Sequence, residues 1–64
     1  MAIHLNAARV NARMTQEEVA KRLKVSKNTI ANYESYKKTP TVQRAKELAK
    51  LFNMSVDEII WSKP

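Results

Sequence analysis

A short run in the middle of the chain carries side chains of the types that bind DNA bases. Lys27, Asn28 and Thr29 are consecutive, and Asn32 follows one helical turn later. In the major groove, lysine pairs with guanine, asparagine pairs with adenine, and threonine contacts the methyl group of thymine. A solvated helix face more often carries Glu–Lys pairs, whereas this run contains no acid before Glu34. We therefore predict that these four residues read base edges.

Residues on both sides of this run are suited to phosphate. Gln16 lies at the predicted start of a helix, where free backbone N–H groups and the positive end of the helix dipole favour an anion. Ser26 directly precedes the run, and a polar, basic segment follows it. The predicted phosphate contacts are Gln16, Ser26, Ser35, Tyr36, Lys37, Lys38 and Thr39. Seen alone, Lys37 and Lys38 fit a solvated loop equally well.

The composition supports a polyanionic partner and disfavours other classes. The 64 residues include 12 lysines and arginines against 6 aspartates and glutamates, a net charge of +6. Such a charge attracts phosphate polymers or anionic membranes. With no cysteine, one histidine and no glycine, the chain lacks the usual ligands of zinc and the glycine loops that bind phosphate. We predict no metal, no cofactor, no small-molecule ligand and no enzymatic activity.

Nothing in the sequence indicates a membrane or secretory segment. No apolar run approaches the ~20 residues of a membrane span, and the first residues lack a basic region followed by an apolar one. We expect a cytoplasmic protein.

Capping residues divide the chain into predicted helices. Thr15 and Ser55 are each followed three residues later by a glutamate, as in a capping box, and Ser26 and Thr41 can cap two more segments. Apolar residues recur at helical spacing, and no segment alternates long enough to indicate a strand. The predicted helices span 3–12, 16–23, 27–35 or 27–36, 42–52 and 56–61. We predict one all-α domain over residues 1–64.

The second and third predicted helices are joined by a very short turn. Only Lys24 and Val25 lie between Leu23 and the cap at Ser26. Such a connection makes two helices cross steeply, as in a helix-turn-helix. A purely structural helix pair has the same spacing, but the polar outer face of the third helix favours a DNA-binding motif over residues 15–36.

The run from Met14 to Glu34 (MTQEEVAKRLKVSKNTIANYE) resembles the Cro/repressor-type (XRE) helix-turn-helix family, and the segment from Pro40 to Ile60 resembles its fourth and fifth helices. The resemblance implies a compact five-helix, lambda-repressor-like domain that binds operator DNA, commonly as a homodimer on an inverted repeat. It assigns base reading and phosphate contacts to the positions given above. It also implies a structural ion pair between Arg9 and Glu34, which agrees with the repulsion that a bare acid facing DNA would cause.

Three positions depart from the family pattern, which usually has glycine where this chain has Lys24, Tyr36 and Asn53. Asparagine tolerates the left-handed backbone conformation that glycine adopts there. At Lys24 and Tyr36 we expect either a strained backbone or, after the third helix, a helix that continues into a rearranged loop.

The last predicted helix carries more apolar residues than so short a segment can bury. These residues are Val56, Ile59, Ile60 and Trp61. They indicate either a dimer surface, used in solution or only on DNA, or a lid over the core.

Three functions remain open. The first is a transcriptional repressor or regulator that reads the major groove with its third helix. The second is an antitoxin-type regulator that binds a toxin protein as well as its own operator, although the chain offers no long disordered tail. The third is an interaction module without DNA binding, which the basic third helix disfavours.

Overall fold

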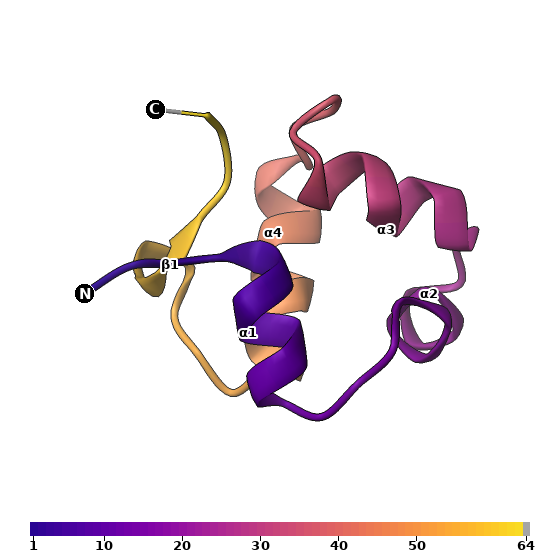
Figure 1. Cartoon of the computed structure of the whole chain (residues 1–64), viewed down its shortest axis with the longest axis horizontal. Helices are drawn as coiled ribbons and strands as arrows, with labels where there is room; N and C mark the ends of the chain where they lie inside the picture. The colour runs from indigo at the N-terminus through magenta and orange to yellow at the C-terminus, as the bar shows by residue number, and fades with distance from the viewer. Residues whose placement is uncertain (64) are drawn as a thin grey trace.

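The computed structural model describes residues 1–63 and consists mainly of helices. The four α-helices are α1 (Leu5–Asn11), α2 (Gln16–Leu23), α3 (Lys27–Glu34) and α4 (Val42–Leu51). Strand β1 (Ile3–His4) precedes them, and a one-turn 3-10 helix, η1 (Val56–Glu58), and strand β2 (Ile59–Ile60) follow. In Figure 1, α4 lies behind the other helices, and the segments at the two ends of the chain meet on the side away from α2 and α3.

The fifth helix predicted over 56–61 is wrong. This segment forms η1 and then β2, which pairs in parallel with β1 so that Ile3 lies opposite Ile59 and His4 opposite Ile60. A helix of one turn gains little to offset the cost of nucleation, while consecutive β-branched and aromatic residues favour an extended backbone. The prediction of a chain without strands is therefore wrong for the two ends of the chain. Between the two strands the structure is helical, as predicted.

The helix starts follow the predicted caps. The Thr15 hydroxyl accepts from the Glu18 N–H (3.1 Å), and the Thr15 N–H donates to the Glu18 carboxylate (2.8 Å). This N–H holds the pKa of Glu18 below its ordinary value. The bond therefore contributes stability above the ordinary pKa, and that contribution is lost as the pH falls through the lowered value. Ser26 and Thr41 accept from the backbone N–H groups of Thr29 and Arg44 in the same way.

All four α-helices end in a left-handed residue, although the sequence contains no glycine. The next N–H group then reaches back to a helix carbonyl, as from Val25 to Ala20 (3.0 Å) and from Lys37 to Asn32 (3.0 Å). The left-handed residues are Arg13 (φ 57°), Lys24 (φ 58°), Tyr36 (φ 64°) and Asn53 (φ 58°). Helix α3 thus ends at Glu34 and does not continue into the loop. Of the two predicted alternatives, Lys24 and Tyr36 show the strained, left-handed backbone.

We expect Lys24→Gly to raise the free energy of unfolding by about 0.5–1 kcal/mol, because glycine avoids the clash of Cβ at positive φ but loses more chain entropy on folding. Urea unfolding measures the change. Lys21→Gly, in the interior of α2, is the matched control and should lower stability by about 1 kcal/mol. A loss at Lys24 as large as the loss at Lys21 would contradict the strain at this turn.

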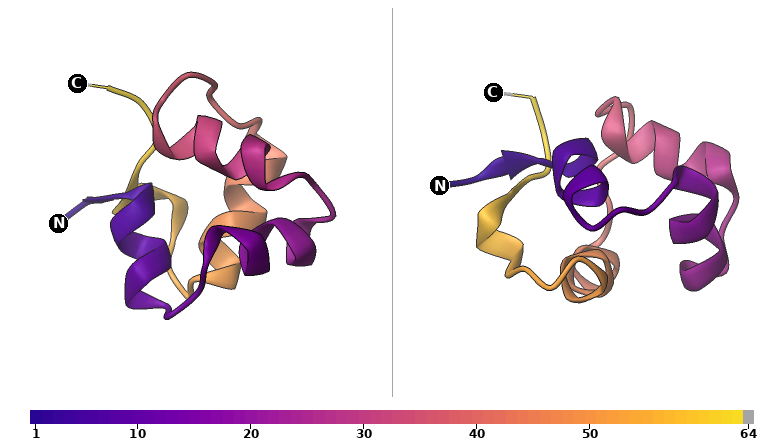
Figure 2. Two further views of the ribbon diagram at one scale, coloured as in Figure 1. Left: turned by 45° about the vertical axis from the view of Figure 1, so that its right-hand side comes forward. Right: turned by 60° about the horizontal axis from the view of Figure 1, so that its bottom comes forward.

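Every α-helix contributes to one hydrophobic core. Leu5, Val19, Ile30 and Leu48 are the largest fully buried side chains, one from each of α1 to α4. Views from two further directions show these helices enclosing the same central space (Figure 2). Among the described residues, no helix combines the length and apolar character needed to cross a bilayer.

The C-terminal segment closes this core from the side of β1. Ile59 is 4% exposed and belongs to the core, so the expectation that it lies on an exposed dimer surface is wrong. The parallel pairing of β2 with β1 turns its side chain inward. Val56, Ile60 and Trp61 are half-buried, and the Trp61 indole N–H donates to the Val56 carbonyl (3.0 Å). Of the four residues predicted for a dimer surface, these three remain accessible to a second copy.

Candidate nucleic-acid interface

The outer side of α3 presents the four residues predicted to read bases. Ile30 is 1% exposed and anchors the inner side of the helix. Lys27 and Asn28 are exposed, and Thr29 and Asn32 are half-buried beside them. The structure therefore brings these four side chains together on one helix that the core holds in place.

Ser26, predicted to contact phosphate, serves first as the cap of α3. Its hydroxyl accepts from the Thr29 N–H (3.2 Å) and shares a hydrogen bond with the Thr29 hydroxyl (3.0 Å). The second bond holds the Thr29 side chain in the first turn of α3. Ser26 thus orders the first turn of α3, and its contact with phosphate stays a prediction.

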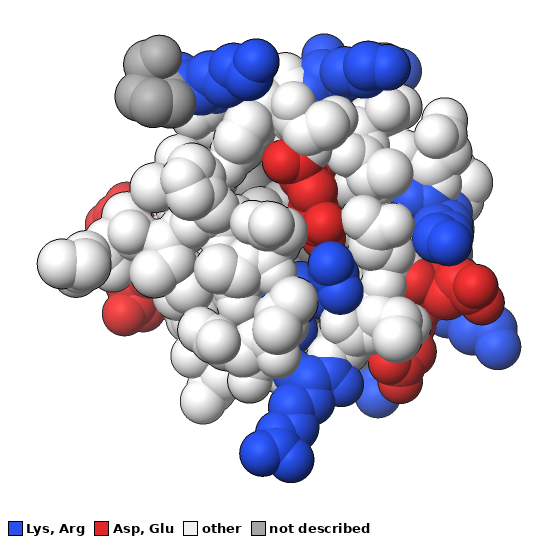
Figure 3. Space-filling model, viewed as in Figure 1, with Lys and Arg blue, Asp and Glu red and all other residues white. Residues whose placement is uncertain are grey.

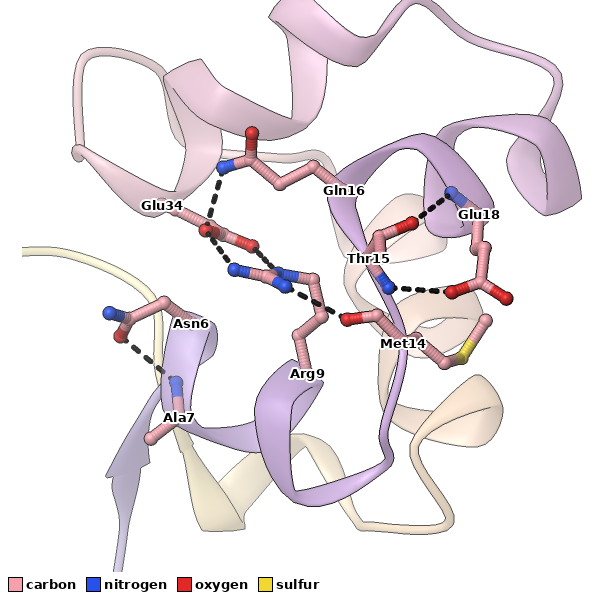
Figure 4. A network of polar contacts seen from close by, with 8 residues as sticks. All are labelled: Asn6, Ala7, Arg9, Met14, Thr15, Gln16, Glu18 and Glu34. Atoms are coloured by element: carbon pink, nitrogen blue, oxygen red, sulfur yellow. Dashed lines mark hydrogen bonds and ion pairs between the residues drawn. The ribbon is translucent and has the colours of Figure 1, made fainter.

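Glu34 is held in a network that joins three helices (Figure 4). Arg9 of α1 donates to both carboxylate oxygens, from Nε to Oε2 (2.6 Å) and from Nη2 to Oε1 (3.3 Å). A third donor of Arg9, Nη1, binds the Met14 carbonyl (2.8 Å). The Glu34 side chain is only 8% exposed. The one acid of α3 is therefore neutralised and covered, and the outer side of the helix carries no exposed negative charge.

Gln16, at the first position of α2, is also part of this network. Its side-chain Nε2 donates to Glu34 Oε1 (3.0 Å). The sequence shows the position of Gln16 at a helix start, but it gives no local sign of a partner on α3. A phosphate at this end of α2 would therefore meet an amide group that Glu34 already orients, together with the N–H groups of the first helical turn that Thr15 does not cap.

The segment 35–39 folds back on the end of α3. The Asn32 carbonyl accepts from the Ser35 hydroxyl (3.3 Å) and from the N–H groups of Lys37 (3.0 Å) and Lys38 (3.3 Å). The side chains of Ser35, Lys37, Lys38 and Thr39 are exposed, as phosphate contacts require. Blue basic side chains lie over this loop and around the start of α3 with white surface between them, and red acidic atoms are visible at the centre of the same face and beside the start of the helix (Figure 3).

Tyr36 is placed differently from the rest of this loop. Its side chain is half-buried, and its hydroxyl forms a hydrogen bond with Nδ1 of His4 in β1. The hydroxyl that the sequence suggested for phosphate is therefore already engaged. Sequence reasoning missed His4, because nothing in its neighbourhood along the chain points to a residue so distant.

Grouped metal-ligating side chains or a surface hollow at α3 would indicate metal or small-molecule chemistry. Within residues 1–63, no three or more His, Cys, Asp or Glu side chains are grouped where they could hold a metal ion. Two shallow hollows flank α4, and neither is lined by a residue of α3. The features gathered around α3 are an exposed helix face, helix N-termini and exposed lysines, which suit an extended anion with bases between its charges.

Comparison with known proteins places this geometry in a family. A family model described as "Helix-turn-helix" matches residues 5–59. An uncharacterized HTH-type transcriptional regulator of Archaeoglobus fulgidus is 36% identical over 59 residues, which cover 92% of this chain and 83% of that protein. The HTH-type transcriptional activator BcrR of Enterococcus faecalis is 34% identical over 56 residues, or 88% of this chain.

A third relative, the HTH-type transcriptional regulator ImmR of Bacillus subtilis, is 34% identical over 56 residues. The match covers 44% of ImmR and 28% of BcrR, so this chain corresponds to less than half of either protein. No solved structure matches the chain significantly.

Proposed function

This chain belongs to the Cro/repressor-type helix-turn-helix family of DNA-binding transcriptional regulators, and we propose that it represses transcription by binding a specific double-stranded operator. Helix α3 enters the major groove, where Lys27, Asn28, Thr29 and Asn32 contact base edges. Gln16, Ser26 and the loop 35–39 contact the flanking phosphates.

The observation that carries this proposal is the charge pattern of α3. Its exposed first turn bears Lys27 and Asn28, while its one acid, Glu34, is covered by Arg9. The ion pair joins α1 to α3, and it also keeps the carboxylate off the outer side of the helix. A helix that lies against a polyanion gains from this, because an exposed carboxylate there would repel phosphate.

The size of the molecule supports binding as a pair that meets on DNA. Two reading helices on an inverted repeat are separated by ~34 Å, one turn of the double helix. The chain measures 27 × 23 × 19 Å, so two copies at that spacing touch only at their edges. Small interfaces of this kind are weak in solution. We propose a homodimer that assembles on the operator, with Ile60 and Trp61 near the contact.

Repression is the simplest outcome for a chain that binds an operator, because occupying a promoter requires no further contact. BcrR is an activator by name, and activation is the alternative outcome. A reporter gene placed behind the operator separates the two, since expression falls with repression and rises with activation. An antitoxin-type regulator also binds its own operator, so it too lowers expression of this reporter, and only binding of a toxin protein would distinguish it from a simple repressor.

Selection of bound DNA from a random pool tests the proposal. We expect an enriched inverted repeat whose half-sites lie one helical turn apart and which binds two chains. Sedimentation of the complex gives the stoichiometry. A pool that stays random after repeated selection would overturn sequence-specific binding.

Removing loop lysines should weaken binding to every DNA sequence alike. Each of Lys37→Ala and Lys38→Ala is expected to lower the slope of log affinity against log salt by about 1, because one phosphate contact and its released counterion are lost. The matched control is Lys46→Ala, an exposed lysine on α4. If all three variants change the slope equally, the loop has no special place in phosphate binding.

A further inference from the structure

The hydrogen bond between His4 and Tyr36 connects the first strand to the loop beside the reading helix. Within residues 1–63, Tyr36 is the only residue of the segment 35–39 whose side chain is hydrogen-bonded to an element other than α3. The two rings are 5.8 Å apart between centroids and tilted by 52°. The loop is thus fastened at its base to the Asn32 carbonyl and at one side chain to β1.

His4 is itself held by its backbone. Strand β1 pairs with β2, with His4 opposite Ile60, and the neighbouring Leu5 and Ile59 are in the core. The imidazole therefore projects from a fixed point, although the side chain lies at the surface. Because His4 is fixed by its strand, its hydrogen bond can restrain the loop 35–39, whose other side chains are exposed.

The backbone of Tyr36 explains why this loop needs such a partner. Tyr36 adopts a φ of 64°, a conformation that a residue with a Cβ atom populates reluctantly. The residues that follow it, Lys37 and Lys38, are exposed and have no side-chain hydrogen bond within the described part of the chain. The N–H groups of both lysines bind the Asn32 carbonyl, and the contact of Tyr36 with His4 adds a second hold on this loop from outside α3.

We propose that His4 is a positioning residue for DNA binding: through Tyr36 it holds the α3–α4 loop so that Lys37 and Lys38 meet the phosphates beside the reading helix. The proposal rests on the proposed function and extends it to a residue outside the helix-turn-helix. His4 itself does not touch DNA. Its effect is to order the loop before binding, so that less conformational entropy is lost in the complex.

The test compares His4→Ala and Tyr36→Phe with the unchanged chain on its selected DNA site. We expect each variant to bind about three- to tenfold more weakly, the range set by one hydrogen bond, and to show a shallower salt slope. Amide hydrogen exchange at Lys37 and Lys38 should become faster in both. The double variant should bind no more weakly than either single one, because both remove the same contact.

Two further variants separate positioning from general destabilisation. In His4→Asn, the amide oxygen takes the place of Nδ1 and should restore affinity, salt slope and slow exchange. Tyr33→Phe removes the same hydroxyl from a half-buried tyrosine of α3, whereas His4 is hydrogen-bonded to Tyr36, and this variant should leave all three unchanged.

Unchanged affinity and loop exchange in His4→Ala would overturn the inference, and so would a His4→Asn variant that binds as weakly as His4→Ala. Weaker binding with unchanged exchange at Lys37 and Lys38 would also overturn it, since the loop would not be what His4 orders. If the chain without any substitution selects no DNA, the proposed function itself is wrong. Failure of the proposed function is thereby distinguished from failure of the role of His4.

Discussion

Glu34→Gln is expected to lower the free energy of unfolding by about 3–5 kcal/mol, because removing one partner of a buried ion pair leaves the other charge uncompensated. Arg9 is only 16% exposed in its side chain and donates to both oxygens of Glu34. A glutamine at position 34 has one acceptor oxygen instead of two and carries no negative charge. It therefore cannot accept all the hydrogen bonds that Arg9 and Gln16 donate to Glu34. At roughly 0.05–0.15 kcal/mol per residue, a chain of this length has little more stability than that to lose.

Urea unfolding of Glu34→Gln, Arg9→Met and the double variant measures the coupling between the two residues. We expect the double variant to be less destabilised than the sum of the single ones, because it leaves no unpaired charge. Glu47→Gln is the matched control, since Glu47 pairs with Arg44 at 3.4 Å but is 45% exposed. Exposed pairs contribute about 0–1 kcal/mol. A Glu34→Gln variant as stable as Glu47→Gln would contradict a structural role for the network.

The combined substitution of Lys27, Asn28 and Asn32 by alanine should abolish the preference for the selected site. Each such contact discriminates between bases by about 1–3 kcal/mol, so losing three should make selected and random DNA bind alike. Binding itself should persist, because the phosphate contacts of the loop and of α2 are independent of sequence. Fluorescence anisotropy with selected and scrambled duplexes measures both quantities.

The control for this variant changes an exposed lysine and an exposed side-chain amide on another helix. Gln43 and Lys46 lie exposed on α4, and their substitution by alanine should leave the preference intact. Circular dichroism should show that the three-residue variant remains helical, since Lys27 and Asn28 are exposed. A preference that survives in this variant would mean that α3 is not the reading helix.

The sequence predicts the central part of the fold well because its signals are local there. Thr15, Ser26 and Thr41 cap the helices at the expected residues, and the short turn at Lys24 fixes the corner between α2 and α3. A cap and its helix lie within a few residues, so the physical cause is visible in the sequence. Even the strain at Lys24 follows from the absence of glycine.

The ends of the chain could not be predicted in this way. Strand β2 exists because Ile59 and Ile60 meet Ile3 and His4, and neither pair has an alternating pattern long enough to identify. The same limit applies to the site. The side-chain types of Gln16 and Tyr36 suggested phosphate, but their partners Glu34 and His4 become neighbours only after the chain has folded.

The pairing of β1 with β2 also orders events during folding. It closes a loop that contains nearly the whole chain, and the entropy lost on closure grows with loop length. The corner between α2 and α3 brings together residues close in sequence and can form early. During synthesis, this corner emerges well before Ile59, which leaves the core open on the side that β2 later covers. Helix α3 therefore forms among the first parts of the molecule, and the pairing with β2 that fixes β1 and its His4 is completed among the last.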